Sequence, residues 1–269
     1  MSKIIFSLFF MALSSLFILG CNAEGFKGFY GSAENSKNNS SGVKVTNSQN
    51  ETVKLSGRTY RKTDYLGNIK LFGEVENVGD GVGVFIKAQC TFYNLDSSEI
   101  DSDSTYIIGS VVTLNTGSNT NTALSPNETG FFEISTDIAT GNVDKFDCHY
   151  TYDTNTITIP YEKLEVSGEV IIKQSSYSDK AEFNGSVFNS GTKDLSFGQV
   201  YFIIKNIAGE IIGISSSYID GETVYLLSIG STTDTALSAG KKGVFSVSTS
   251  VRFNEFSSYT LRTDWSSSK

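Results

Sequence analysis

The sequence predicts an all-β protein built from two β-sandwiches in tandem, and three observations lead to that prediction. The stretch at residues 71–77 recurs at residues 183–189, with Gly73, Val75 and Asn77 repeated at a constant offset (185 − 73 = 112). Short runs rich in Val, Ile, Phe, Tyr and Thr alternate with Gly, Ser and Asn turns, as in sandwich domains. No window in either copy has the 3.6-residue apolar period of a long helix.

Residues 1–20 are expected to be a signal peptide, because Lys3 precedes an apolar run too short to span a bilayer comfortably. The run ends in Ile18-Leu19-Gly20-Cys21, which resembles the lipobox of bacterial lipoproteins. The resemblance implies cleavage before Cys21 and lipidation of its sulfur, so that acyl chains such as palmitate anchor the protein to a membrane. The alternative is an ordinary secretory signal with a chance cysteine. Asn22 stands where inner-membrane lipoproteins carry Asp, which favours the outer membrane or cell surface.

Residues 21–54 are expected to form a disordered, flexible tether that begins with the lipidated cysteine. They are rich in Asn, Ser, Lys and Gly and show no period of either strand or helix. Such a segment buries too little apolar surface to offset the entropy lost on ordering. A flexible chain of about 30 residues has a mean reach of about 30 Å. The tether would therefore hold the folded part clear of the membrane.

The folded part is expected to be two domains, residues 55–160 and 161–269, joined near Pro160. The offset between the copies is 112 up to Tyr106 and Tyr218, and it becomes 113 at Ala123 and Ala236, so one loop gained a residue. Each copy has about the length of an immunoglobulin-like sandwich, roughly 100 residues. In the first copy, strands are expected at residues 69–77, 84–93, 106–114 and 146–152, with a polar turn at 94–103. A further strand before residue 146 is expected to point Phe132 and Ile134 into the core.

Both copies resemble the FxLYD domain, a small immunoglobulin-like β-sandwich of prokaryotic envelope proteins. The repeated Gly-x-Val-x-Asn strand comes first, followed by Cys90-Thr-Phe-Tyr-Asn94 in one copy and Phe202-Ile-Ile-Lys-Asn206 in the other. A Glu-Ile hairpin then follows at Glu99-Ile100 and Glu210-Ile211. Asn replaces the Asp of the motif in both copies, and Cys90 replaces its Phe. The resemblance implies a fold, with structural rather than catalytic motif residues.

Composition and charge narrow the classes of partner. The chain has 39% hydrophobic and 19% charged residues, enough apolar side chains to bury a core. The net charge of −8 opposes binding to phosphate backbones, so no nucleic-acid partner is expected. The same charge disfavours docking to anionic lipid, so membrane association needs the lipid anchor.

Cys90 and Cys148 are predicted to form a disulfide. With Cys21 lipidated, they are the remaining pair in an exported and oxidising setting. Their counterparts in the second copy, Phe202 and Leu261, are apolar, so two core positions carry cysteines in one copy only. The alternative is two buried free thiols.

The other candidate residues are assigned structural or surface roles. His149 neighbours Cys148, but consecutive strand residues point to opposite faces, so a surface histidine is expected instead of a Cys-His pair. An acidic group (Asp96, Glu99, Asp101 and Asp103) has oxygen ligands for Ca²⁺ but lacks the EF-hand register, so a solvated hairpin is expected. Five aromatic residues at matched positions are expected in the core: Tyr60, Tyr65, Tyr177, Tyr152 and Trp265. The alternative is that these residues line a binding groove.

These observations lead to the expectation of a non-enzymatic bacterial envelope lipoprotein. The favoured function is a protein-binding module displayed from the membrane, because the loops and edges of such sandwiches suit protein contacts. The alternative is a structural or assembly subunit of an envelope complex. No catalytic residue, metal, cofactor or small-molecule substrate is predicted from this sequence.

Overall fold

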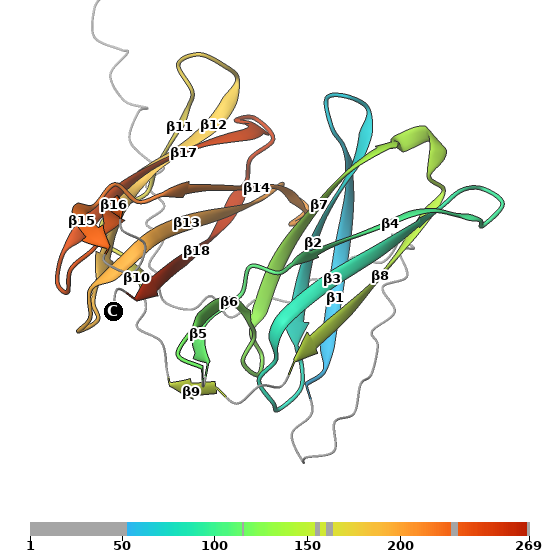
Figure 1. Ribbon diagram of the computed structural model, residues 1–269. Helices are drawn as coiled ribbons and strands as arrows, with labels where there is room; N and C mark the ends of the chain where they lie inside the picture. The colour runs from blue at the N-terminus through green and yellow to red at the C-terminus, as the bar shows by residue number, and fades with distance from the viewer. Residues whose placement is uncertain (1–52, 115, 154–156, 160–163, 227–230, 268–269) are drawn as a thin grey trace, which may run out of the picture. The chain divides into compact units, whose positions relative to one another are not determined.

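Strands make up most of the described chain, so the predicted all-β sandwich class is confirmed (Figure 1). The computed structural model describes residues 53–114, 116–153, 157–159, 164–226 and 231–267, all within the compact unit 32–269. The helical element in that part of the chain is a short 3-10 turn, η1 (Thr140–Asn142). The predicted signal peptide, Cys21 and nearly all of the tether lie outside the described residues.

The first copy is a sandwich in which two three-stranded sheets share one core. One sheet has the order β1-β2-β7 and the other has the order β4-β3-β8, while β6-β5-β9 forms a smaller sheet. Its strands are β1 (Leu55–Thr63), β2 (Asn68–Asn77), β3 (Val84–Tyr93), β4 (Glu99–Tyr106), β5 (Ser110–Leu114), β6 (Asn119–Ala123), β7 (Thr129–Ala139), β8 (Lys145–Asp153) and β9 (Ile157–Ile159).

The second copy repeats this arrangement with its own core. Its sheets are β14-β13-β18, the pair β15-β16, and a third in which β12 pairs with β10, β11 and β17. The single strand β1 corresponds here to two short strands on either side of Gly168, which has a positive φ of 81°. The strands are β10 (Leu164–Val166), β11 (Ile171–Gln174), β12 (Lys180–Asn189), β13 (Leu195–Lys205), β14 (Ile211–Tyr218), β15 (Glu222–Leu226), β16 (Ser231–Ala236), β17 (Lys242–Arg252) and β18 (Ser258–Ser267).

The repeated glycine allows an aromatic ring to lie against the strand. A Cβ added to Gly73 would lie 2.0 Å from the ring of Phe132, and one added to Gly185 would lie 2.7 Å from the ring of Phe245. Both rings are buried in the core of their copy. A side chain at either position would overlap the core ring, so the glycine has a packing role.

The repeated asparagine connects a strand end to two loops. Asn77 is fully buried, and its Nδ2 donates to the carbonyl oxygens of Gly81 and Leu124 at 2.7 and 3.1 Å. Asn189 is equally buried, and its Nδ2 donates to the carbonyl oxygens of Lys193 and Leu237, both at 2.9 Å. In each copy Oδ1 also accepts from the backbone two residues ahead. The motif asparagine is therefore hydrogen-bonded to the backbone of two loops, as expected of a buried polar side chain.

The structure differs from the sequence expectation around the acidic hairpin. The polar turn covers only residues 94–98, and β4 already begins at Glu99, where it pairs with Tyr93 of β3. The expected strand 106–114 is divided, since β4 ends at Tyr106 and β5 begins at Ser110. Strand β4 is polar and mostly exposed, so it has no alternation of apolar residues by which a sequence pattern identifies a strand.

Candidate functional site

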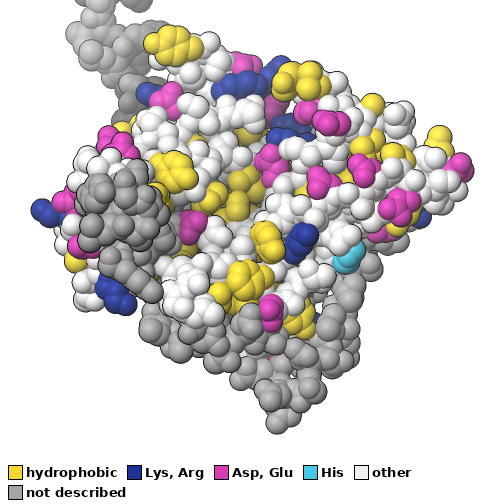
Figure 2. All heavy atoms as spheres, viewed as in Figure 1, with side chains coloured by type: hydrophobic (Ala, Val, Ile, Leu, Met, Phe, Trp, Pro, Cys, Tyr) yellow, Lys and Arg dark blue, Asp and Glu magenta, His cyan; other side chains and the backbone are white. Residues whose placement is uncertain are grey.

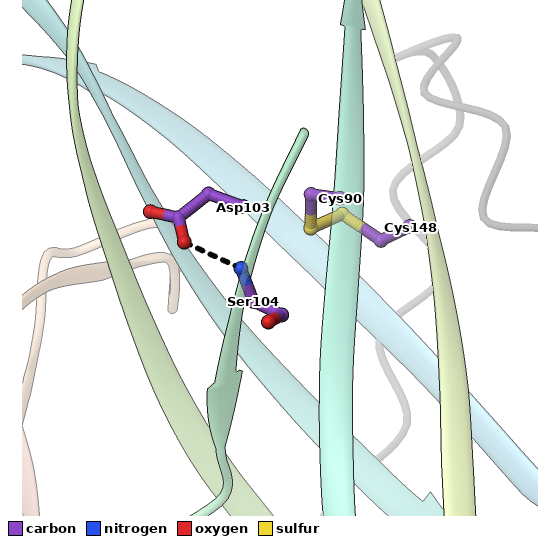
Figure 3. The surroundings of a disulfide bond; sticks show 4 residues. All are labelled: Cys90, Asp103, Ser104 and Cys148. Atoms are coloured by element: carbon purple, nitrogen blue, oxygen red, sulfur yellow. Dashed lines mark hydrogen bonds between the residues drawn. A yellow bond between two sulfur atoms is a disulfide. The ribbon is translucent and has the colours of Figure 1, made fainter. Parts of the chain in front are cut away.

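The predicted disulfide is present between Cys90 of β3 and Cys148 of β8 (Figure 3). The two residues are direct cross-strand partners with a Cα separation of 4.1 Å, and both lie in the first core. Phe202 and Leu261 are direct partners in the second copy. An apolar pair in one copy thus corresponds to a covalent pair in the other, and the sulfurs have a structural role.

The carboxylates of β4 lie along the edge of a sheet. Glu99, Asp101 and Asp103 are all exposed, and Asp103 accepts from its neighbour Ser104 at 2.6 Å (Figure 3). The corresponding strand β14 carries no carboxylate and packs against the first copy through Ile211. Charge on an exposed edge strand opposes pairing with other chains, whereas a covered edge needs no such protection. Within the described residues no three carboxylate, histidine or cysteine side chains are placed to hold a metal ion.

The expectation that the repeated tyrosines are core residues is wrong for two of them. Tyr65 and Tyr177 are 94% and 99% exposed, at the tips of the β1–β2 and β11–β12 hairpins. Trp265 is buried, as expected, and Tyr152 packs against the first core. Tyr60 packs against a small apolar cluster at the contact between the copies. Tyrosine is common both in cores and at turns, so its residue type alone does not distinguish these places.

His149 lies on β8 opposite Gln89 and is partly exposed, while its neighbour Cys148 is buried in the disulfide. The two side chains therefore do not form a nucleophile and base pair. Figure 2 shows acidic and apolar side chains scattered across the drawn face, with the single histidine at the surface.

The two copies contact each other through polar and apolar groups. Phe72 and Phe131 of the first copy form a buried cluster with Ile203 and Ile211 of the second. Lys205 Nζ lies 3.1 Å from Glu74 Oε2 in the same region. Arg262 Nη2 donates to the carbonyl oxygen of Thr129 at 2.6 Å, and Arg262 Nη1 lies 3.7 Å from Glu128 Oε1.

A cavity of about 340 Å³ lies between β6 and the sheet β14-β13-β18. Its aromatic wall includes Phe197, which has a positive φ of 54° at a bulge of β13. Such bulges redirect side chains and are common beside binding sites. Sequence reasoning singled out one of the lining residues, Trp265, and assigned it to the core. The lining residues are Asn119, Thr120, Asn121, Phe197, Gln199, Tyr218, Asp264 and Trp265.

Asp264 is the charged group of this cavity. Its Oδ2 accepts from Asn121 Nδ2 at 2.6 Å, and its Oδ1 accepts from the backbone N–H of Trp265 at 2.7 Å. Burial raises the pKa of its carboxyl, although these two hydrogen bonds oppose the shift. No lysine or arginine of the described residues pairs with it. Burial and the nearby Asp264 also raise the pKa of Tyr201 to about 12.

Replacing Asp264 with asparagine is expected to stabilise the protein at neutral pH by up to about 1 kcal/mol. A carboxyl with a raised folded-state pKa binds its proton more tightly when folded. Its ionisation therefore lowers the free energy of unfolding as pH rises through the range between the unfolded and folded pKa values. Thermal unfolding of the two proteins should differ at neutral pH and converge in acid. Asp220→Asn, at an exposed position of the same copy, should show no such pattern. A stability loss above about 2 kcal/mol in Asp264→Asn would mean that the carboxylate is structural.

No protein-family model matches the chain, and no curated protein is similar to it in sequence. Among solved structures, the crystal structure of red sea bream transglutaminase is similar over 79% of this chain, with 10% identity and a TM-score of 0.22. The chain spans 29% of the length of that enzyme. Within the described residues, no helix is both long and apolar enough to cross a membrane.

Proposed function

We propose that this protein is a non-enzymatic interaction module of the bacterial envelope, with two FxLYD-like sandwiches held at the membrane by a lipid on Cys21. The proposed partner is a protein. The outer membrane or cell surface is the proposed location, because Asn22 follows the lipidated cysteine.

The observation that carries the protein-binding proposal is a set of exposed apolar side chains at matched hairpin tips. Tyr65 and Tyr177 are 94% and 99% exposed, and Leu95 and Ile207, at the β3–β4 and β13–β14 tips, are 86% and 95% exposed. Each pair is 112 positions apart, so both copies retain an apolar residue where solvent exposure gives no stability. Exposed aromatic and aliphatic side chains at loop tips are typical anchors in protein interfaces.

Capture experiments on the full chain test this proposal. The tagged protein, purified from solubilised membranes after cross-linking, is expected to retain a protein partner, and the Tyr65→Ser/Tyr177→Ser variant should retain at least fivefold less. Tyr106→Ser is the matched control, because Tyr106 is 54% exposed but lies at the end of β4. A stoichiometric envelope protein would favour the assembly-subunit alternative over a displayed binder. Equal capture by all three proteins would contradict binding through the tips.

The anchor is tested in the same preparation. Cys21→Ser removes the sulfur that would carry the lipid, so this variant should move from the membrane fraction to the soluble fraction. Membrane association unchanged in Cys21→Ser would contradict the proposed anchor without affecting the capture result.

A further inference from the structure

The duplication allows the wall that the second copy contributes to this cavity to be compared with the same place in the first copy. In the first copy Tyr106, Lys87 and Thr151 are direct cross-strand partners on β4, β3 and β8. Lys87 Nζ lies 6.0 Å from the centroid of the Tyr106 ring, within the usual range of a cation–π contact. The first copy therefore places an ammonium group of its own on this tyrosine.

The second copy keeps the tyrosine and changes its two partners. Tyr218, Gln199 and Asp264 are direct cross-strand partners on β14, β13 and β18. The row Tyr-Lys-Thr of the first copy has thus become Tyr-Gln-Asp, which removes a cation and adds a carboxylate. All three residues of the new row line the cavity.

Among the described residues of the second copy, no lysine or arginine replaces the missing lysine. Gln199 Nε2 donates to Ser216 Oγ at 3.0 Å, and its Oε1 accepts from Tyr201 at 2.9 Å, so its amide is held within the sheet. The nearest basic residue along β18 is Arg262, which is directed to Thr129 and Glu128 of the first copy. Asp264 therefore accepts from two amide N–H groups, and no cationic side chain in the described part of the chain pairs with it.

We propose that this cavity binds the ammonium group of a lysine side chain, which the Asp264 carboxylate pairs and the exposed Tyr218 ring contacts. The identification of the lysine as that of a protein partner rests on the proposed function. The bound ammonium group would take the place over the Tyr218 ring that corresponds to the place of Lys87 Nζ over the Tyr106 ring in the first copy. The net charge of −8 favours the approach of a basic partner. A partly desolvated carboxylate and an aromatic ring are the two groups that bind ammonium ions in proteins.

Trp265 gives a direct readout, because it is the single tryptophan of the chain and lines the cavity. The full chain in nonionic detergent is titrated with Nα-acetyl-lysine methylamide while tryptophan fluorescence is followed. A saturable change is expected, and the neutral Nε-acetylated analogue should bind at least tenfold more weakly. Higher salt should weaken binding of the charged probe, since the carboxylate remains in contact with solvent.

Two variants complete the experiment. Asp264→Asn should lower the affinity for the charged probe at least tenfold. Gln199→Lys supplies an internal ammonium group as in the first copy and should abolish the saturable response. Circular dichroism must show that both variants are folded. If Gln199→Lys is not folded, Tyr218→Ser replaces it, and its affinity for the charged probe is expected to be at least threefold lower.

An equal response to the charged and neutral probes, or an unchanged affinity in folded Asp264→Asn, would overturn the inference. If the Tyr65→Ser/Tyr177→Ser variant loses partner capture but keeps its response to the probe, the hairpin tips and this cavity act independently. Failure of the proposed function can then be told apart from failure of this inference.

Discussion

Reduction of the Cys90–Cys148 disulfide is expected to lower the free energy of unfolding of the first sandwich by about 4 kcal/mol, from the entropy of the closed loop. The cysteines are 58 residues apart in the sequence, and the bond joins two adjacent strands of one sheet. Unfolding of the second sandwich should change little, because its core has no disulfide. Hydrogen exchange measured by mass spectrometry with and without reductant should show faster exchange in β1–β8 only.

Trp265 provides the internal control for this experiment. It is buried in the second core, so its fluorescence reports chiefly the unfolding of the second copy. The tryptophan transition is expected at the same denaturant concentration in both redox states. Unchanged exchange in the first copy after complete reduction would contradict a stabilising role of the disulfide. A shift of the tryptophan transition by the same free energy would instead show that the copies unfold as one cooperative unit.

Asn189→Ala is expected to destabilise the second sandwich by about 3 kcal/mol, because it removes three hydrogen bonds between a fully buried amide and the loop backbone. The carbonyl oxygens of Lys193 and Leu237 and the N–H of Gly191 would each lose one hydrogen bond, while the Leu237 carbonyl keeps the hydrogen bond from the Leu195 N–H. Denaturant unfolding followed by Trp265 fluorescence measures the loss.

Asn184→Ala is the matched control in the same strand. Asn184 is only partly buried and donates to Glu182 at 3.1 Å, so its replacement should cost less than about 1 kcal/mol. The corresponding substitution Asn77→Ala should act on the first sandwich and leave the tryptophan transition in place. A cost below about 1 kcal/mol for Asn189→Ala would mean that water or a shifted loop replaces the amide.

The repeat explains why much of the fold was predictable from the sequence. Two copies aligned at one offset identify positions under the same packing constraint, so the strand with Gly73 and Asn77 could be placed without further information. The disulfide followed from the same alignment, since Cys90 and Cys148 occupy positions that are apolar in the other copy. The predicted signal peptide, Cys21 and nearly all of the predicted tether lie outside the described residues.

The parts that sequence reasoning missed depend on exposure and on register across strands. Polar strand β4 has no apolar alternation, and the exposure of Tyr65 at a turn depends on how far the hairpin projects. The cavity residues Gln199 and Asp264 are far apart in sequence and become partners only through strand pairing. A signal was nevertheless available, because these two positions differ in charge from Lys87 and Thr151 of the first copy.

The most direct test of the proposal that the second copy binds a basic protein partner is partner capture by the full-length protein and its Asp264→Asn variant, measured side by side from solubilised membranes. The prediction is that the variant stays folded and in the membrane fraction but retains at least tenfold less partner, and that Nα-acetyl-lysine methylamide elutes the partner from the wild-type protein. Equal retention by both proteins, with no elution by the charged probe, would contradict the claim.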